Sequence, residues 1–244
     1  PTANLVSIVI LSRGKCGLSK CITRYLVAMS VSDLILVFTE VILSRIISYH
    51  FPNSFLFITP VCRLIFFLFA TTTATSVWFT VSFTFDRYVA ICCQKLKTKY
   101  CTDKTACVVI AVINVLFIGQ NIPWYFLLTS VQIVTNIPWG CEINPDFFTS
   151  LTWAAFDLLD IILTPIIPFL LIMLLNALTV SHILVASRAR SRLWGYSSAD
   201  RNRGASDSDP EIKNRRKSIV LLFAVSARQL KTHSRLSYAF PGHG

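Results

Sequence analysis

The sequence predicts an all-α membrane protein with about five membrane-spanning helices and the beginning of a sixth. Three observations support this fold class. The 244-residue chain is 54% hydrophobic and only 14% charged, a composition that soluble domains seldom reach. Its apolar residues form runs long enough to cross a bilayer. Lysine and arginine gather in every second linker between those runs, as expected when the basic loops face the cytoplasm.

The apolar runs divide the chain into its predicted elements. The predicted spans cover about residues 1–11 (an incomplete first span), 22–47, 61–93, 105–128 and 147–186. Residues 219–225 form a stub of a sixth helix, which reaches only about 10 Å and cannot cross the hydrocarbon layer. Residues 187–217 are interpreted as a disordered basic loop, and residues 226–244 as an aberrant polar tail. Residues 1–225 are then one partial bundle of helices.

The basic residues predict the orientation of the chain in the plasma membrane. Linkers 12–24, 94–104 and 187–217 are rich in lysine and arginine, whereas linkers 48–60 and 129–150 contain neither. The basic linkers are therefore predicted to be cytoplasmic and the N-terminus extracellular. The net charge of +11 is explained by these linkers, so nucleic acid is not an expected partner, whereas the lipid bilayer is.

The eight cysteines are distributed unevenly across this predicted topology. Six lie in or near the reducing cytoplasmic side, and only Cys62 and Cys141 lie on the oxidising side. These two cysteines are therefore predicted to form a disulfide. The alternative is a pair of free thiols facing the outside.

The third apolar run ends abruptly in Asp86, Arg87 and Tyr88. Cys62 lies at the other end of the run, roughly 37 Å from Arg87 along a helix. This arrangement resembles the third helix of rhodopsin-like G-protein-coupled receptors. An arginine that snorkels at a helix end beside an acid is the simpler alternative. The resemblance implies a seven-transmembrane-type helical bundle, incomplete in this chain.

The resemblance also implies a function, the transfer of an extracellular ligand signal to a heterotrimeric G protein. In that family the arginine pairs with its neighbouring acid at rest and meets the G protein after activation, which assigns these roles to Arg87 and Asp86. The segments R-G-K-C-G-L-S and C-Q-K-L-K-T-K-Y look most similar to orphan receptors of the amino-acid- and peptide-sensing branch.

Three polar residues match the polar core of the same family. Asp33 lies in the middle of the second span, where an ionisable group indicates function, and Ser76 lies eleven residues before Arg87. The resemblance implies an allosteric sodium ion at Asp33 and Ser76, with Asn4 of the first span directed toward the aspartate. A carboxylate and a hydroxyl suit a hard cation. The alternative is a buried acid that hydrogen-bonds without an ion. No other cofactor is expected.

Further positions match ligand-facing positions of the family: Glu40, Phe69, Ala70, Thr73, Asp157, Asp160 and Thr164. Pro165 and Pro168 are expected to kink the fifth helix. An acidic and aromatic pocket suits a ligand with an ammonium group and an apolar body, such as a small amine, an amino acid or a peptide. The alternative is that the acids are merely solvated at helix ends. Trp124 and Trp139 are interpreted as interfacial anchors.

The end of the chain departs from the family pattern. It contains neither Cys-Trp-x-Pro nor Asn-Pro-x-x-Tyr, so the chain is expected to be truncated within the sixth helix and unable to signal in this form. A channel or transporter that uses the intramembrane acids is the competing function. Only 8 glycines and no internal repeats are present, which argues against it. The four histidines have no metal-site or triad spacing, so an enzyme is not expected.

Overall fold

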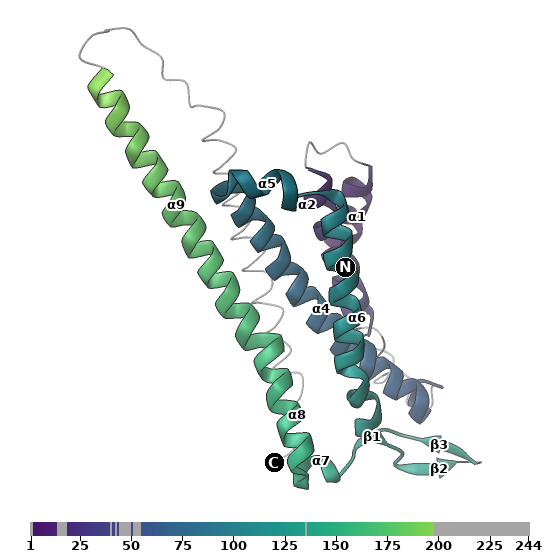
Figure 1. The fold of residues 1–244 in the computed structure, drawn as a ribbon. Coiled ribbons are helices and arrows are strands. Elements are labelled where there is room, and N and C mark those ends of the chain that lie inside the picture. The colour runs from purple at the N-terminus through teal and green to yellow at the C-terminus, as the bar shows by residue number, and fades with distance from the viewer. Residues whose placement is uncertain are drawn as a thin grey trace. The chain divides into compact units, whose positions relative to one another are not determined.

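Helices make up most of the computed structural model, which describes residues 2–13, 19–39, 41, 43, 50, 55–134 and 136–197 (Figure 1). Three described stretches are long and apolar enough to cross a membrane: Thr59–Cys92, Asp103–Leu127 and Leu151–Ala189. The predicted class, an all-α membrane protein, is confirmed. The chain divides into one unit of Pro1–Ser82 and Thr102–Pro168 and a second of Phe83–Cys101 and Phe169–Gly244, and each is described by itself.

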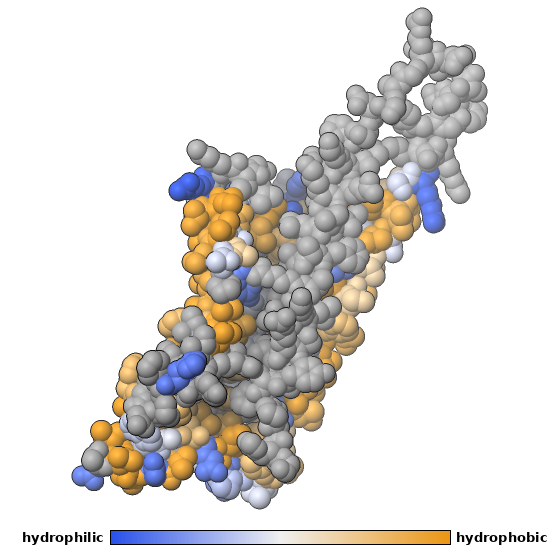
Figure 2. All heavy atoms as spheres, turned by 180° about the vertical axis from the view of Figure 1, so that it is seen from behind, coloured by the Kyte–Doolittle hydropathy of each residue, from blue (hydrophilic) through white to orange (hydrophobic). Residues whose placement is uncertain are grey.

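Large apolar side chains are exposed along the helices. Val115, Leu116 and Val185 are 70%, 61% and 64% exposed, and Figure 2 shows hydrophobic residues over much of the described surface on the face drawn. Such exposure would be unfavourable in water, but hydrocarbon tails can cover these side chains. The exposed surface therefore agrees with a chain that lies in a bilayer.

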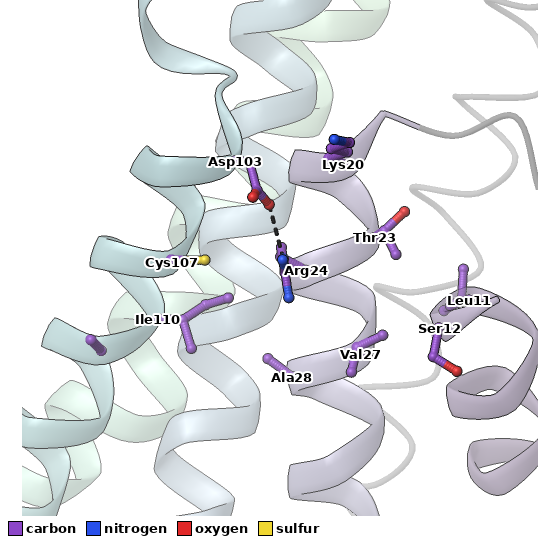
Figure 3. Close-up of a pocket in the computed structure, with 11 residues that line it drawn as sticks. Leu11, Ser12, Lys20, Thr23, Arg24, Val27, Ala28, Asp103, Cys107 and Ile110 are labelled. Atoms are coloured by element: carbon purple, nitrogen blue, oxygen red, sulfur yellow. Dashed lines mark hydrogen bonds and ion pairs between the residues drawn. The ribbon is translucent and has the colours of Figure 1, made fainter. Parts of the chain in front are cut away.

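The first helices of the chain pack side by side within the first unit. α1 (Thr2–Ser12) is apolar but short, and α2 (Lys20–Val37) packs against both α1 and α6 (Asp103–Leu127) (Figure 3). The core face of α2 buries Tyr25 and Met29. The 18 residues of α2 also include Lys20, Arg24 and Asp33, which explains why this helix is less apolar than the other spans.

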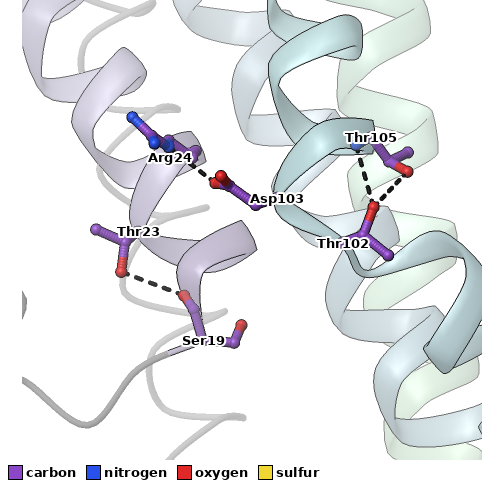
Figure 4. Close-up of polar contacts among 6 residues, drawn as sticks. All are labelled: Ser19, Thr23, Arg24, Thr102, Asp103 and Thr105. Atoms are coloured by element: carbon purple, nitrogen blue, oxygen red, sulfur yellow. Dashed lines mark hydrogen bonds and ion pairs between the residues drawn. The ribbon is translucent and has the colours of Figure 1, made fainter.

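A threonine cap begins α6. The Thr102 hydroxyl accepts a hydrogen bond from the amide of Thr105 at 3.2 Å, and the two hydroxyls lie 2.8 Å apart (Figure 4). Asp103 occupies the first turn, where a carboxylate interacts favourably with the positive end of the helix dipole. This cap sets the position at which the helix begins and thus where Asp103 lies.

The longest helix is α4 (Thr59–Cys92), with 34 residues. Pro60 is tolerated in its first turn because the amide it lacks would have no partner within the helix. The hydroxyls of Thr72, Thr73, Thr75 and Thr80 donate to the carbonyl four residues earlier at 2.7–3.1 Å. These bonds satisfy polar groups inside an apolar layer. The helix ends at Cys92 because the backbone of Cys93 is not helical, and α5 (Gln94–Tyr100) follows.

The predicted fifth span is a broken helix. It consists of α7 (Asp146–Thr149), α8 (Leu151–Ile161), a π-helical turn (Ile162–Ile166) and α9 (Ile167–Ser197). The end of α9 at Ser197 lies beyond residue 186, so residues 187–197, expected to begin a disordered loop, are helical instead. The basic residues of this segment do not end the helix, because arginine has a high helix propensity, as do the alanine and leucine that lie beside the arginines.

Short strands connect α6 to α7. β1 (Leu128–Thr129) pairs with β4 (Glu142–Ile143), and β2 (Gln132–Val134) pairs with β3 (Ile137–Trp139), both antiparallel. The turn at the end of β3 requires glycine, since Gly140 has φ +82° and an added Cβ would lie 2.8 Å from a methyl group of Val131. A 3₁₀ turn at Phe55–Phe57 precedes α4. The sequence pattern predicted none of these strands.

Several predicted features lie outside the described residues. They are Glu40, residues 44–47 of the second span, residues 198–217 of the basic loop, the stub at 219–225 and the tail at 226–244.

Candidate functional site

A disulfide joins Cys62 in α4 to Cys141, which follows β3. Their Cα atoms are 6.5 Å apart and the two residues are 79 positions apart in the sequence. This bond attaches the β-strand segment to one end of α4, which we call the Cys62 end. The disulfide that the sequence predicts is therefore present.

Hydrogen bonds reinforce the attachment at the Cys62 end. The Thr59 hydroxyl donates to the carbonyl of Gly140 at 2.8 Å, and the Gly140 amide donates to the carbonyl of Phe57 at 2.8 Å. Arg63, near the start of the third predicted span, donates from Nε to the Leu128 carbonyl at 2.7 Å. Its guanidinium also lies 6.0 Å from the ring centre of Tyr125. Arg63 is thus a structural residue that fixes the segment leaving α6.

The predicted polar core brings two helices into direct contact. The Ser76 hydroxyl of α4 donates to Oδ1 of Asp33 in α2 at 2.7 Å, and Ser76 is almost fully buried. Asn4 is buried on α1, the helix that packs against α2. No three histidine, cysteine or acidic side chains come together as a metal site among the described residues. A carboxylate and a hydroxyl in contact nevertheless fit a monovalent hard cation, with further oxygens from carbonyls or water.

The other end of α4, which we call the Arg87 end, carries a buried ion pair. Asp86 and Arg87 pair through Oδ2 and Nη2, and their side chains are only 2% and 12% exposed. The Arg87 guanidinium lies 5.8 Å from the ring centre of Phe83. Its Nε is buried and has no hydrogen-bond partner within the described chain. Tyr88 is partly exposed. The arrangement holds a charged group with one donor still unsatisfied.

The short helix α5 packs back against the Arg87 end. The Cys101 thiol donates to the backbone carbonyl of Asp86 across 3.7 Å, and the rings of Phe85 and Tyr100 meet edge to face at 5.5 Å. Burial first, and then the Asp86 carboxylate, raise the pKa of Cys101 to about 11. Cys101 therefore stays a neutral thiol at physiological pH and adds no charge beside the ion pair.

Three of the predicted ligand-facing side chains, those of Thr73, Asp160 and Thr164, make polar contacts within the first unit. Oδ1 of Asp160 accepts hydrogen bonds from Gln120 Nε2 and Thr164 Oγ1, each at 3.3 Å. Asp160 is thus partnered rather than merely solvated, and Asp157 lies one turn earlier on the same helix. Thr73 donates to the carbonyl of Phe69 at 2.8 Å. Ala70 is partly buried beside these residues in α4.

Pro165 and Pro168 shape the π-helical turn. In such a turn a carbonyl accepts from the amide five residues later, but for Leu163 that residue is Pro168, which has no N–H. The indole Nε1 of Trp78 in α4 donates to the Leu163 carbonyl instead, at 3.0 Å. Pro168 therefore leaves an acceptor that a side chain of α4 satisfies.

The interpretation of Trp124 as an interfacial anchor is wrong. Its side chain is buried, and its ring lies 5.2–6.5 Å from those of Phe66, Phe147, Trp153 and Phe156. Its Nε1 has no partner among the described residues, whereas an anchor would direct this group toward water. Trp139 is partly exposed in β3 and pairs with Gln132.

The sequence matches the family described as 7 transmembrane receptor (rhodopsin family) over residues 3–233. This match covers nearly the whole chain and includes both ends of α4. The chain belongs to the rhodopsin family of seven-transmembrane receptors. As a rhodopsin-family receptor it is a multi-pass membrane protein whose general role is receptor signalling. A channel or transporter is not favoured, and the family is generally not enzymatic.

The receptor fold brings together some of the residues that the sequence singled out. Asp33 contacts Ser76, Cys62 is bonded to Cys141, Asp86 pairs with Arg87, and Asp160 contacts Thr164. The contacts that were not predicted include the ion pair between Arg24 and Asp103 and the hydrogen bond from Gln120 to Asp160. In each of these contacts, both partners are polar residues that lie inside an apolar run or at its end. A polar residue in such a position is the sequence signal that could have identified them.

Proposed function

We propose that this receptor transmits the binding of an extracellular ligand to a heterotrimeric G protein through Asp86, Arg87 and Tyr88. The buried ion pair at the Arg87 end, with one guanidinium donor unsatisfied, is the observation that carries the proposal. The basic linkers support a plasma-membrane orientation with the Arg87 end in the cytoplasm and the N-terminus outside.

The proposed switch uses the difference between two states of Arg87. With Asp86 as its partner, the guanidinium is held by a charge-assisted hydrogen bond, but its buried Nε has no partner among the described residues, which costs free energy. A G-protein segment that offers carbonyl or carboxylate oxygens can satisfy all of its donors. Binding of the partner would then shift the population toward the state in which the pair is broken.

Replacing Arg87 with alanine is expected to lower receptor-stimulated nucleotide exchange by about tenfold or more, since a hydrogen bond to a charged group contributes about 1.5–3 kcal/mol. Exchange is measured in sealed vesicles with the G protein added at the Arg87 face. The chain is used both by itself and joined to the sixth and seventh helices of another rhodopsin-family receptor.

The matched control for this experiment is Lys97→Ala, which removes an exposed base on α5. If both variants lost the same amount of nucleotide exchange, Arg87 would contribute only general positive charge, and the proposed switch would be contradicted. Exchange that requires the G protein on the opposite face would refute the orientation.

The ligand is proposed to be a small amine, an amino acid or a peptide, as in the amino-acid- and peptide-sensing branch. Asp157 and Asp160 supply negative charge, and the aromatic cluster around Trp124 lies on elements of the same unit. Carboxylates beside aromatic rings suit an ammonium group with an apolar body. The exchange assay with a panel of amines, amino acids and peptides tests this ligand class. Activation by acidic ligands alone would contradict the proposed ligand class.

Asp33 and Ser76 are proposed to hold an allosteric sodium ion. A bound sodium ion would supply a positive charge that balances the Asp33 carboxylate inside the membrane. At equal ionic strength, the unfolding temperature of the receptor is expected to be higher in sodium than in potassium. At saturation, bound sodium should add roughly 1–3 kcal/mol to the free energy of unfolding. The difference should vanish in Asp33→Asn and shrink in Ser76→Ala. Ser7→Ala, which alters a half-buried serine of α1, is the control, and equal unfolding temperatures in both salts would argue against an ion.

A further inference from the structure

A cavity of about 800 Å³ lies between α1, α2 and α6, within the first unit. It is lined by Leu11, Ser12, Lys20, Thr23, Arg24, Val27, Ala28, Asp103, Cys107, Ile110 and Ala111 (Figure 3). Its volume falls in the range typical of small-molecule sites. Neither the proposed ligand pocket nor the Arg87 end shares any of these residues.

The mouth of the cavity is polar and carries more positive than negative charge. Lys20 and Arg24 come from the first turns of α2, and Asp103 from the first turn of α6. Arg24 Nε pairs with Asp103 Oδ1 at 2.9 Å, and the two side chains are 56% and 37% exposed (Figure 4). Among the described residues, this contact holds the guanidinium through Nε, so its two terminal NH₂ groups are available to a ligand. The carboxylate offsets one of the two cations.

The floor of the cavity is apolar. Val27 and Ala28 follow Arg24 along α2, and Ile110 and Ala111 follow Cys107 along α6. The two alanines are small enough to leave room between the helices. A polar mouth at the helix ends and an apolar floor deeper along the same helices match a molecule with an anionic head and a hydrocarbon tail.

We propose that this cavity binds an anionic phospholipid, with its phosphate at Lys20 and Arg24 and an acyl chain along Val27, Ala28, Ile110 and Ala111. The occupant follows from the charge and the place of the site. A soluble phosphate would leave the apolar floor without a contact, and a sterol has no negative charge to pair with the two cations. The cytoplasmic leaflet, which the basic linkers predict at these helix ends, is rich in anionic lipids.

The test measures binding of a phosphatidylglycerol that carries a fluorophore on its acyl chain to the full chain in a neutral detergent. Lys20→Gln/Arg24→Gln is expected to weaken binding by about fivefold or more, because each base near an anionic headgroup contributes favourably. Lys97→Gln/Lys99→Gln removes the same charge from α5, outside the cavity, and should change binding less than about twofold. Phosphatidylcholine with the same fluorophore should bind more weakly than phosphatidylglycerol.

A variant with the opposite sign makes the test independent of any loss of folding. Asp103→Asn removes the carboxylate from the mouth and is expected to tighten phosphatidylglycerol binding about threefold or more. A purely structural ion pair would give no tightening. Equal losses in both double variants, equal binding of the two lipids, displacement by inorganic phosphate, or displacement by a sterol would each overturn the proposal.

Discussion

Replacing Asp86 with alanine is expected to destabilise this receptor by about 3–5 kcal/mol, the effect of removing one partner of a buried ion pair. Asp86 is 2% exposed and Arg87 is 12% exposed, so the variant would leave the guanidinium with little access to water. The Nε of Arg87 already lacks a partner in the part of the chain that the structure describes, and the variant would also remove the carboxylate that Nη2 contacts. The unfolding temperature in detergent measures the loss.

Two further variants separate the buried charge from general effects of the substitution. Asp86→Ala/Arg87→Met removes the whole pair and should be more stable than Asp86→Ala alone, since an apolar pair leaves no orphaned charge. Asp103→Ala breaks the exposed pair with Arg24 and removes a carboxylate from the first turn of α6, so it should lower the unfolding temperature much less than Asp86→Ala. If Asp86→Ala and Asp103→Ala lowered it equally, burial of the Arg87 pair would have no energetic consequence. Under the proposed function, Asp86→Ala also raises basal nucleotide exchange, because it frees Arg87.

The features that depend on local sequence were predicted well. An apolar run without interior proline or glycine has few alternatives to a helix inside a bilayer, and α4 begins and ends close to the run at residues 61–93. The charges that end the run also mark the Asp86–Arg87 pair, because neighbours in sequence at a helix end need no tertiary information to meet. The disulfide required only the sidedness of each cysteine.

Features that depend on packing between distant segments could not be predicted. The paired strands after α6 are only two or three residues long, too short for an alternating pattern to appear. Trp124 has the position of an interfacial anchor, but its burial depends on rings from α4, α7 and α8. Arg24 and Asp103 are 79 residues apart, and each alone has the sequence pattern of a solvated helix end. The cavity between them exists only after α1, α2 and α6 have packed.

The resemblance to known receptors contributed the contacts that local patterns could not supply. Asp33 and Ser76 are 43 residues apart and lie on different helices, yet the structure places their oxygens 2.7 Å apart. Spacing relative to Arg87 singled out Ser76, and the family pattern supplied its partner. The π-helical turn was anticipated only as a kink. Two prolines predict missing backbone hydrogen bonds, but they do not predict which side chain donates in their place. The indole of Trp78 donates this hydrogen bond.

Loss of the disulfide is the second large expected effect. Cys141→Ser should destabilise the receptor by about 2–4 kcal/mol, because a cross-link between residues 79 positions apart removes many conformations from the unfolded chain. The hydrogen bonds from Thr59 to Gly140 and from Arg63 to Leu128 remain in the variant. These contacts should keep the strand segment near the Cys62 end in the native state, so unfolding is expected to stay cooperative at a lower temperature.

Reduction provides the control for this prediction. A reductant should lower the unfolding temperature of the unmodified receptor to that of Cys141→Ser, Cys62→Ser and the double variant, and should leave those three variants unchanged. Cys107→Ser, which alters an exposed free cysteine, should retain the full response to reductant. An unmodified receptor whose unfolding temperature does not respond to reduction would show that the bond adds no stability. The attachment of the strand segment to α4 would then rest on Thr59 and Arg63, whose contacts each contribute only about 0.5–1.5 kcal/mol when neutral groups are involved and somewhat more for a charged donor.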